Sequence, residues 1–184
     1  MAEGPLLTSL RVLDLSLGDG DAVSRILADL GADVLKIEPP GGAPHRLAKP
    51  TVSGVSVSFT LNNANKRCAQ MNPGNPEDRA RLLDLAATAD VVVDSGNPGG
   101  AASFETSCLQ LSEMFDHLVA LSVTDFGSCG PYASWRATDA VLYAMSSALS
   151  RTGPTSGTPV LPPVGVASGT AVVQAAWAVL VAYY

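Results

Sequence analysis

Basic residues are scarce in this sequence of 184 residues, which has 11 lysines and arginines against 17 aspartates and glutamates and a formal net charge of −6. No basic stripe could neutralise phosphates and release counterions, so a nucleic-acid partner is not expected. Cysteine is also scarce: Cys68, Cys108 and Cys129 stand at unrelated spacings. They fit neither a zinc pattern nor a disulfide framework, which predicts reduced thiols in a cytoplasmic protein and no bound metal.

Targeting and membrane-spanning segments are also missing from the pattern. The N-terminal segment MAEGPLLTSL has no basic region followed by an apolar core, so no signal peptide is predicted. The most apolar stretch, residues 171–184, is about fourteen residues long, which predicts a buried helix and not a membrane span. It ends at Tyr183-Tyr184 without a polar cap, so we expect a chain cut within its fold or one covered by a partner. Its wide apolar surface also predicts an oligomer.

A strand–helix–strand unit is predicted over residues 11–40. Val12, Leu13 and Leu15 form a short apolar run typical of a buried parallel strand. A helix with apolar residues at helical spacing follows, with Asp21 as the expected N-cap and Gly31 as the expected stop. A second apolar run then ends at two prolines, where a sheet ladder must end.

The same alternation continues along the chain. Further strands are expected at 55–59, after the turn at 62–71, at 91–93 and at 118–123. Helices are expected from the Asn75 cap to about residue 89, near 104–115 and at 139–149. A Gly/Pro-rich linker is expected at 151–163. With 47% hydrophobic residues, the sequence predicts a single α/β domain over residues 1–184, built on a doubly wound sheet. Ligands of such sheets bind at the carboxyl ends of strands, here the loops 17–21, 39–46, 95–100 and 124–132.

Residue spacing alone identifies little chemistry in these loops. The segment GDGDAV suggests a dinucleotide fingerprint, but Val23 holds the third glycine position and Asp19 and Asp21 would repel a pyrophosphate. His45 and His117 are isolated histidines, and neither a nucleophile elbow nor a catalytic triad can be assembled. Two adjacent cations at residues 66–67 form a candidate anion site, and a solvated turn is the alternative.

Several separated motifs occur in a specific order: RVLDLS, LADLGADVLKIEPPGG, NKR, NPEDRARLLDLAATADVVVD, GPYA and AMSSALSRTG. In this order they resemble the N-terminal half of family III CoA-transferases, which include formyl-CoA and carnitine CoA-transferases and alpha-methylacyl-CoA racemase. The resemblance implies a Rossmann-like, mostly parallel sheet with helices on both faces. It also implies interlocked subunits, and a small domain and a return segment that 184 residues would lack.

The same resemblance implies a catalytic aspartate that attacks the acyl-CoA thioester. In VGVASGTAVV that position is Thr170, whose neutral hydroxyl is a poor nucleophile without a base. A histidine that the racemases place before a conserved aspartate is Thr138 here, and that aspartate is Asp139. The resemblance therefore implies a domain with its catalytic acid missing.

The ligand loops keep part of the family pattern. Lys66 and Arg67 of the NKR turn and Gly130 of the GPY segment are retained, whereas the family's Glu-Asn-Phe-x-Pro-Gly motif reads DSGNPG, with Ser95 and Gly96 replacing its amide and aromatic residues. These five residues are the expected contacts of coenzyme A or an acyl-CoA substrate, which we expect to bind weakly.

Three hypotheses follow. The first is a family III CoA-transferase-like domain that is silent alone and works with an identical copy or with a paired CoA-transferase subunit or domain. The second is an active transferase or racemase whose acid is relocated to Asp125 or Asp139. The third is a structural interaction domain that no longer binds CoA.

Overall fold

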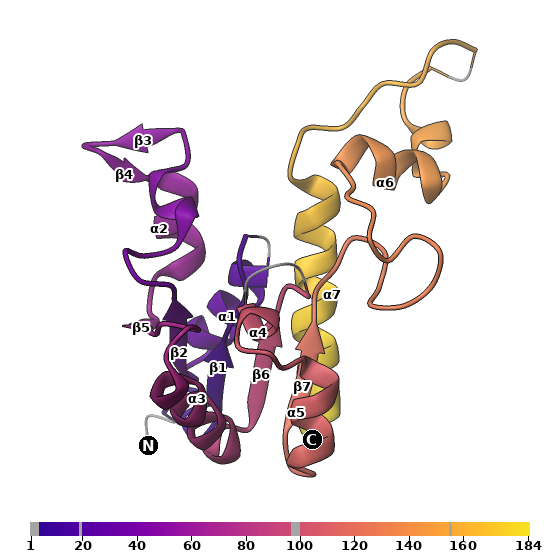
Figure 1. Cartoon of the computed structure of the whole chain (residues 1–184). Coiled ribbons are helices and arrows are strands. Elements are labelled where there is room, and N and C mark those ends of the chain that lie inside the picture. The colour runs from indigo at the N-terminus through magenta and orange to yellow at the C-terminus, as the bar shows by residue number, and fades with distance from the viewer. Residues whose placement is uncertain (1–3, 19, 97–99, 155) are drawn as a thin grey trace.

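A parallel sheet forms the centre of the molecule. The computed structural model describes residues 4–18, 20–96, 100–154 and 156–184. Its five-stranded sheet has the order β5-β2-β1-β6-β7, and all neighbouring strands are parallel (Figure 1). In that order the strands are Arg67–Gln70, Asp33–Glu38, Arg11–Asp14, Val91–Asp94 and Val119–Ser122. This is the order of a doubly wound fold, so the predicted α/β class is confirmed.

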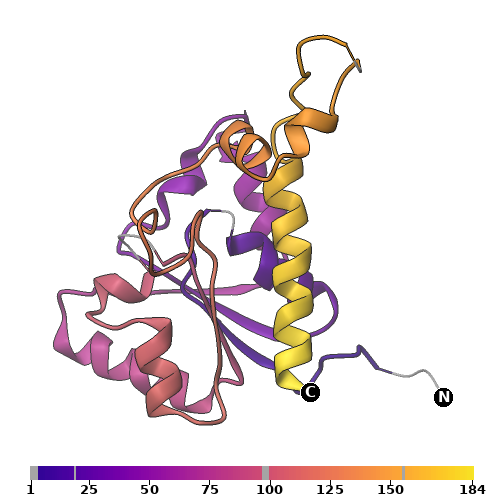
Figure 2. The ribbon, with the colours of Figure 1, turned by 90° about the vertical axis from the view of Figure 1, so that its right-hand side faces the viewer.

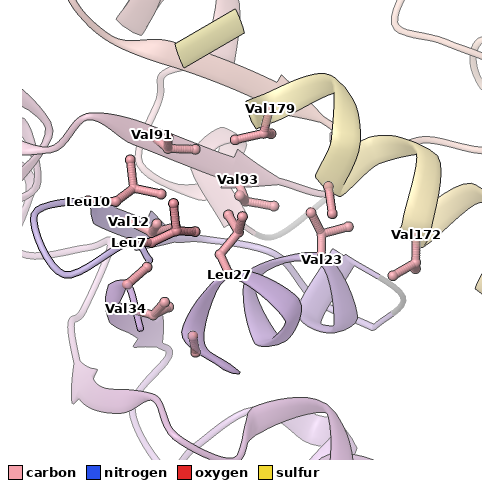
Figure 3. Close-up of a cluster of buried hydrophobic side chains, with 13 residues drawn as sticks. Leu7, Leu10, Val12, Val23, Leu27, Val34, Val91, Val93, Val172 and Val179 are labelled. Carbon is pink, nitrogen blue, oxygen red and sulfur yellow. The ribbon is translucent and has the colours of Figure 1, made fainter. Parts of the chain in front are cut away.

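Helices cover both faces of the sheet. On one face, α1 (Gly20–Asp29) and α7 (Val166–Tyr183) pack against a buried cluster of mainly aliphatic side chains (Figure 3). On the other face lie α3 (Pro76–Thr88), α4 (Gly100–Ser103) and α5 (Cys108–Met114), over a second buried cluster. Because successive strand residues point to opposite faces, β1, β2, β6 and β7 contribute to both clusters, and the edge strand β5 contributes only to the second. The first cluster takes Val12, Val34, Val91 and Val93, and the second takes Leu13, Ile37 and Val92.

The remaining elements lie around the carboxyl end of the sheet. They are a two-stranded antiparallel ribbon of β3 (Thr51–Val52) and β4 (Val55–Ser56), followed by α2 (Val57–Asn63), and later α6 (Asp139–Met145). Single turns of 3₁₀ helix occupy Pro44–Leu47 and Ala148–Arg151. The segment between α6 and α7 extends beyond the N-terminal end of α7 (Figure 2). This segment includes the predicted linker.

Local signals in the sequence account for several element boundaries. Asn75 accepts a hydrogen bond from the Glu77 backbone N–H at 3.0 Å and Pro76 is the first residue of α3, so the predicted cap is confirmed. Gly31 follows α1 with φ +105°, a conformation that favours glycine, so the predicted stop is confirmed as well.

Several local predictions were wrong. The stretch 62–71, expected as a turn with a strand after it, itself contains β5. The helix expected at 139–149 ends at Met145 and is followed by a 3₁₀ turn. The stretch 55–59 is a strand only at its first two residues, because the Ser56 hydroxyl accepts from the Phe59 N–H and thereby starts α2. The helix expected near 104–115 is shorter: α5 begins only at Cys108, after Glu105 with its φ of +59° and the Ser107 N-cap, and it ends at Met114. Asp21 is not an N-cap but lies inside the first turn of α1, where its side chain is buried.

The last helix is longer and more exposed than expected. α7 has 18 residues with a mean hydropathy of 1.6, and 17% of them are buried. By length and composition α7 could cross a membrane, yet Val172, Ala176 and Val179 pack into the cluster shared with α1 and the sheet. Trp177 and Val181 remain 65% and 60% exposed. The prediction of a shorter, buried helix was therefore wrong in both length and burial.

Candidate functional site

The candidate site lies where the strand order reverses, at the carboxyl ends of β1 and β6. The β1–α1 loop and the β6–α4 loop leave this point in different directions, which is where doubly wound folds bind ligands. A pocket of about 400 Å³ opens there, and the segment after β7 and the first turns of α7 complete its wall. Its polar lining residues are His45, Ser95, Thr124, Asp125, Arg136 and Ser168.

A smaller apolar pocket adjoins this one. It has a volume of about 130 Å³ and lies between the ends of β1 and β2 and the start of α4. Leu15, Ile37 and Phe104 form its apolar wall, and Leu17 lines both pockets. The two pockets therefore lie beside the same β1–α1 loop.

A buried network of charged side chains joins the β1–α1 loop to the ends of β1 and β2. The Lys36 ammonium, fully buried, donates to Asp21 Oδ1 at 2.6 Å and to the Ser16 carbonyl at 2.8 Å. The Asp14 carboxylate accepts from the hydroxyls of Ser16 and Ser24 at 2.5 and 2.6 Å. These bonds hold the loop's backbone and the first turn of α1 to the ends of β1 and β2.

Lys66 supplies the second cation of this network. Its ammonium donates to Asp14 Oδ2 at 2.9 Å, to the Asp21 carbonyl at 2.7 Å and to Asn63 Oδ1 at 2.8 Å. An ammonium has three N–H donors, so all of them are engaged. The Asn63 amide in turn donates to Asp21 Oδ2 at 3.0 Å. Two carboxylates thus face two ammonium groups in the protein interior.

The pKa values of the network follow from burial and mutual attraction. Burial alone would raise the pKa of Asp14, but the ammonium groups of Lys36 and Lys66 and the two hydroxyls lower it overall. Burial opposes the charged form of Lys36, yet Asp14 and Asp21 raise its pKa above the ordinary value. For Lys66 burial dominates and its pKa is lowered. Asp14 therefore stays ionised and holds Lys36 in its charged form.

The β6–α4 loop is organised by Asp94 at the end of β6. Its carboxylate accepts from the backbone N–H groups of Gly96 and Ala101, both at 3.1 Å. Burial raises the pKa of Asp94, and these N–H bonds offset only part of that rise. Gly100 has φ +51°, and a Cβ there would clash with the Asp94 carboxylate and the Leu15 carbonyl. Only glycine therefore fits this junction between the two loops.

A third structured turn follows β2. Glu38 is buried and accepts from the Ala43 N–H at 2.8 Å and from the Arg46 guanidinium at 2.7 Å through both of its oxygens. Burial would raise the pKa of Glu38, but these bonds lower it to about 2. The Arg46 guanidinium also lies 4.3 Å from the centroid of the Phe59 ring. This clamp holds the turn that carries His45 at the edge of the pocket.

The structure separates the two cations that the sequence had paired. Lys66 reaches Asp14 on the α1 face of the sheet, whereas Arg67 points to the α3 face and binds Asp33 with bonds of 2.7 to 3.0 Å. Adjacent residues of an extended segment point to opposite faces, so one phosphate cannot contact both side chains. They do not form a joint anion site, and their individual assignment to CoA stays a prediction.

The other expected ligand contacts lie at different distances from the pocket. Ser95 lines it, and its hydroxyl accepts from the Leu17 N–H at 3.2 Å. Gly96 follows with φ +64°, where a Cβ would collide with Thr124. Gly130 lies in the exposed loop after β7 and does not line the pocket. Residues Asn97, Pro98 and Gly99 of the same motif, and Asp19 of the first loop, lie outside the described residues.

Thr170 lies on the exposed side of α7, two residues beyond Ser168, which lines the pocket. Its hydroxyl donates to the Val166 carbonyl at 2.8 Å. The alternative acids also have partners: Asp125 Oδ2 accepts from the Ala137 N–H at 2.9 Å, and Asp139 Oδ2 accepts from the Gly165 N–H at 2.6 Å, at the start of α7. Of these two carboxylates, only Asp125 lines the pocket.

Sequence reasoning missed several residues of this site. His45 is isolated in the sequence, yet its ring lies next to Gly18 on the rim of the pocket. Arg136 supplies the guanidinium of the pocket and carries no motif in the sequence. Lys36 could have been noticed, because a lysine within an apolar strand needs a buried anion. Among the described residues no group of three His, Cys, Asp or Glu side chains could hold a metal ion.

Known proteins with similar sequences include CoA-transferases. Residues 7–184 match the model of CoA-transferase family III. A probable CoA-transferase of Mycobacterium tuberculosis is 64% identical over 177 residues, which are 94% of this chain and 22% of that protein. Human succinyl-CoA:glutarate CoA-transferase is 32% identical over 163 residues, which are 87% of this chain and 37% of that enzyme.

Solved structures show the same fold. A CAIB/BAIF family protein of Brucella suis superposes with a TM-score of 0.80 at 29% identity, over 97% of this chain and 50% of that one. A hypothetical protein of Mycobacterium tuberculosis gives 0.81 at 28% identity over the same shares. The chain thus spans half the length of these solved relatives and less than half that of the curated ones. With the family model matching almost its whole length, this chain belongs to CoA-transferase family III.

Proposed function

We propose that this chain handles acyl-CoA thioesters as the Rossmann-like part of a family III CoA-transferase. The observation that carries the proposal is the pocket of about 400 Å³ at the strand-order reversal, where Ser95, Arg136 and the first turns of α7 meet. Membership of the family supports it, since the relatives carry names such as succinyl-CoA:glutarate and formyl-CoA:oxalate CoA-transferase. The adjoining apolar pocket of about 130 Å³ suits the less polar parts of a long CoA molecule.

We further propose that the chain is catalytically silent by itself. The resemblance assigns the nucleophilic aspartate to Thr170, whose exposed hydroxyl donates to a backbone carbonyl. A hydroxyl that is neutral at pH 7 and has no base to take its proton is a poor nucleophile, and its ester is not activated toward CoA. Loss of the nucleophile costs several orders of magnitude in rate.

A second copy, subunit or domain would then supply the missing carboxylate. The mycobacterial relative supports this arrangement: 177 matched residues are 22% of it, whereas 163 are 37% of the human enzyme, so it is nearly twice as long. One relative from Chloroflexus aurantiacus is named as the beta subunit of a succinyl-CoA–L-malate CoA-transferase, at 30% identity. We propose that this chain forms an oligomer or pairs with a catalytic half of this kind.

The second candidate function is an active enzyme with a relocated catalytic acid. The observation that favours it is that Asp125 lines the pocket. Its carboxylate is already committed to the Ala137 N–H, which makes it a loop-organising group first. An active enzyme built on Asp125 predicts turnover by the unmodified chain.

The test is a transfer assay with the purified chain, succinyl-CoA and a free dicarboxylic acid, together with titration of CoA by calorimetry. We expect CoA to bind and no transfer above background, a deficit of about a thousandfold or more against an active relative. When a catalytic half is supplied, Thr170→Asp should give a hydroxylamine-sensitive adduct on the peptide of this chain that contains residue 170, and Thr170→Asn, of the same shape without the charge, should give none on that peptide. Turnover by the unmodified chain would refute the proposal that it is inactive alone. Absence of CoA binding would refute the proposed CoA function and favour a structural interaction domain.

A further inference from the structure

Arg67 lines a groove that has no part in the proposed function. Arg67 begins β5, and its side chain lies on the α3 face of the sheet. There a groove of about 360 Å³ runs between α3 and the first residues of β1, β2 and β5. Figure 1 shows α3 beside this end of the sheet, away from the loops that form the candidate site. Arg11 from β1 and Arg81 from α3 line the same groove.

The groove has an excess of positive charge. Arg67 binds the single lining carboxylate, Asp33, through three hydrogen bonds of 2.7 to 3.0 Å. Within the described part of the chain, the side chains of Arg11 and Arg81 form no ion pair. The nearby Asp90 carboxylate accepts from the Arg11 backbone N–H at 2.7 Å and does not line the groove. Two guanidinium groups therefore remain unbalanced, in a chain whose net charge is −6.

The floor of the groove is apolar. Leu35 and Ala69 contribute from the sheet and Leu85 from α3. A volume of about 360 Å³ lies within the usual range of small-molecule sites, which combine apolar walls with a few placed polar groups. A planar guanidinium with paired N–H donors matches the oxygens of a phosphate or carboxylate, and the two guanidinium groups of Arg11 and Arg81 on one groove suit a multiply charged anion.

We propose that this arginine groove is a second ligand site, which binds a small molecule carrying a phosphoryl group. The proposal does not depend on CoA binding at the carboxyl end of the sheet, because no residue lines both the groove and either of the pockets there. The apolar floor would hold the body of the ligand, and Arg11 and Arg81 its oxyanion. Because the groove is open to water, its affinity should fall as ionic strength rises.

The experiment titrates the 184-residue chain with inorganic pyrophosphate, inorganic phosphate and citrate at low salt, using ¹⁵N-resolved NMR shifts. We expect saturable binding of pyrophosphate in the millimolar range or tighter, with the largest shifts in β5 and the start of β1. Arg11→Ala and Arg81→Ala should each weaken it about tenfold. Arg25→Ala is the matched control, because Arg25 carries the same charge on α1 and pairs there with Asp29.

The outcomes separate the alternatives. Equal weakening by Arg25→Ala would show only a general charge effect and overturn the proposal. Citrate binding more tightly than pyrophosphate would reassign the groove to carboxylates and overturn its phosphoryl specificity. No saturable binding up to about 10 mM would also overturn it, and would favour an acidic protein segment as the occupant. Arg81→Ala and the unmodified chain should bind CoA with the same affinity by calorimetry. Failure of the groove proposal can therefore be told apart from failure of the proposed CoA function.

Discussion

Replacing Lys36 by methionine should destabilise the protein far more than breaking an equally short ion pair on its surface. Methionine approximates the volume of lysine but removes the ammonium that binds Asp21 at 2.6 Å and lies 3.8 Å from Asp14. The two buried carboxylates then face a single ammonium, that of Lys66. Breaking a buried pair by removing one partner typically costs about 3–5 kcal/mol, a large share of a total stability of about 5–15 kcal/mol.

The matched control is Arg67→Met. Its pair with Asp33 has nearly the same length, 2.7 Å, but the two side chains are 68% and 48% exposed. Exposed pairs of this kind contribute about 1 kcal/mol or less, because water already solvates both charges. Urea unfolding followed by far-UV circular dichroism, with similar slopes for the three proteins, would measure both free energies of unfolding.

The pH dependence makes this test sharper. With Lys36 present, the lowered pKa of Asp14 contributes stability above its ordinary value of 3.8, and this contribution is lost as pH falls below it. Without Lys36, burial should raise the pKa of a carboxylate in the network, so that protonation relieves the buried charge. The difference in free energy of unfolding between Lys36→Met and the unmodified protein should therefore become smaller from pH 7 to pH 4. If Lys36→Met and Arg67→Met lower the free energy of unfolding at pH 7 by amounts that agree within about 1 kcal/mol, the reasoning is refuted.

Two further substitutions probe the loops of the site. Glu38→Gln should lower stability at pH 7 by about 1–2 kcal/mol, allowing for the partly exposed Arg46, because the pKa of Glu38 is lowered to about 2. That contribution is present above the ordinary pKa of 4.5 and fades as pH falls toward 2, so unfolding curves of the two proteins should converge there. Gly100→Ala should cost about 2 kcal/mol or more in thermal or urea unfolding, because its Cβ would clash with the Asp94 carboxylate.

Each of these two predictions has its own control. Gly41 also has a positive φ, +87°, but no heavy atom lies within 4 Å of a Cβ there. Gly41→Ala should therefore show the backbone cost alone, about 1 kcal/mol, and a loss as large as that of Gly100→Ala would remove the steric argument. For Glu38, a stability deficit in Glu38→Gln that is unchanged between pH 7 and pH 2 would show that shape and not charge is responsible.

The order and type of most elements could be predicted from the sequence because their signals are local. Val91–Asp94 is buried on both faces, so its strand appears as an unbroken apolar run. The Asn75 cap and Gly31 satisfy or end the backbone of their own helices, and no distant residue is needed. The alternation of such runs was enough to predict the doubly wound class, and the ordered motifs were enough to suggest the family.

The chemistry of the site depended on contacts that local patterns do not contain. Lys66 and Arg67 are neighbours in the chain, but the extended backbone directs them to opposite faces, so an apparent pair of cations serves two separate places. Ser56 begins a helix where alternating residues suggested a strand, because a hydroxyl placed to cap the chain outweighs a weak β pattern.

The buried charges show the same limit most clearly. Asp14 is bound by Ser24, Lys36 and Lys66, which come from a helix, a neighbouring strand and a turn 52 residues away. A charged residue in a sequence is expected at the surface, since burying it alone is too costly. Only the packed structure brings the opposite charges and hydroxyls together, and their mutual attraction is what makes burial of all of them stable.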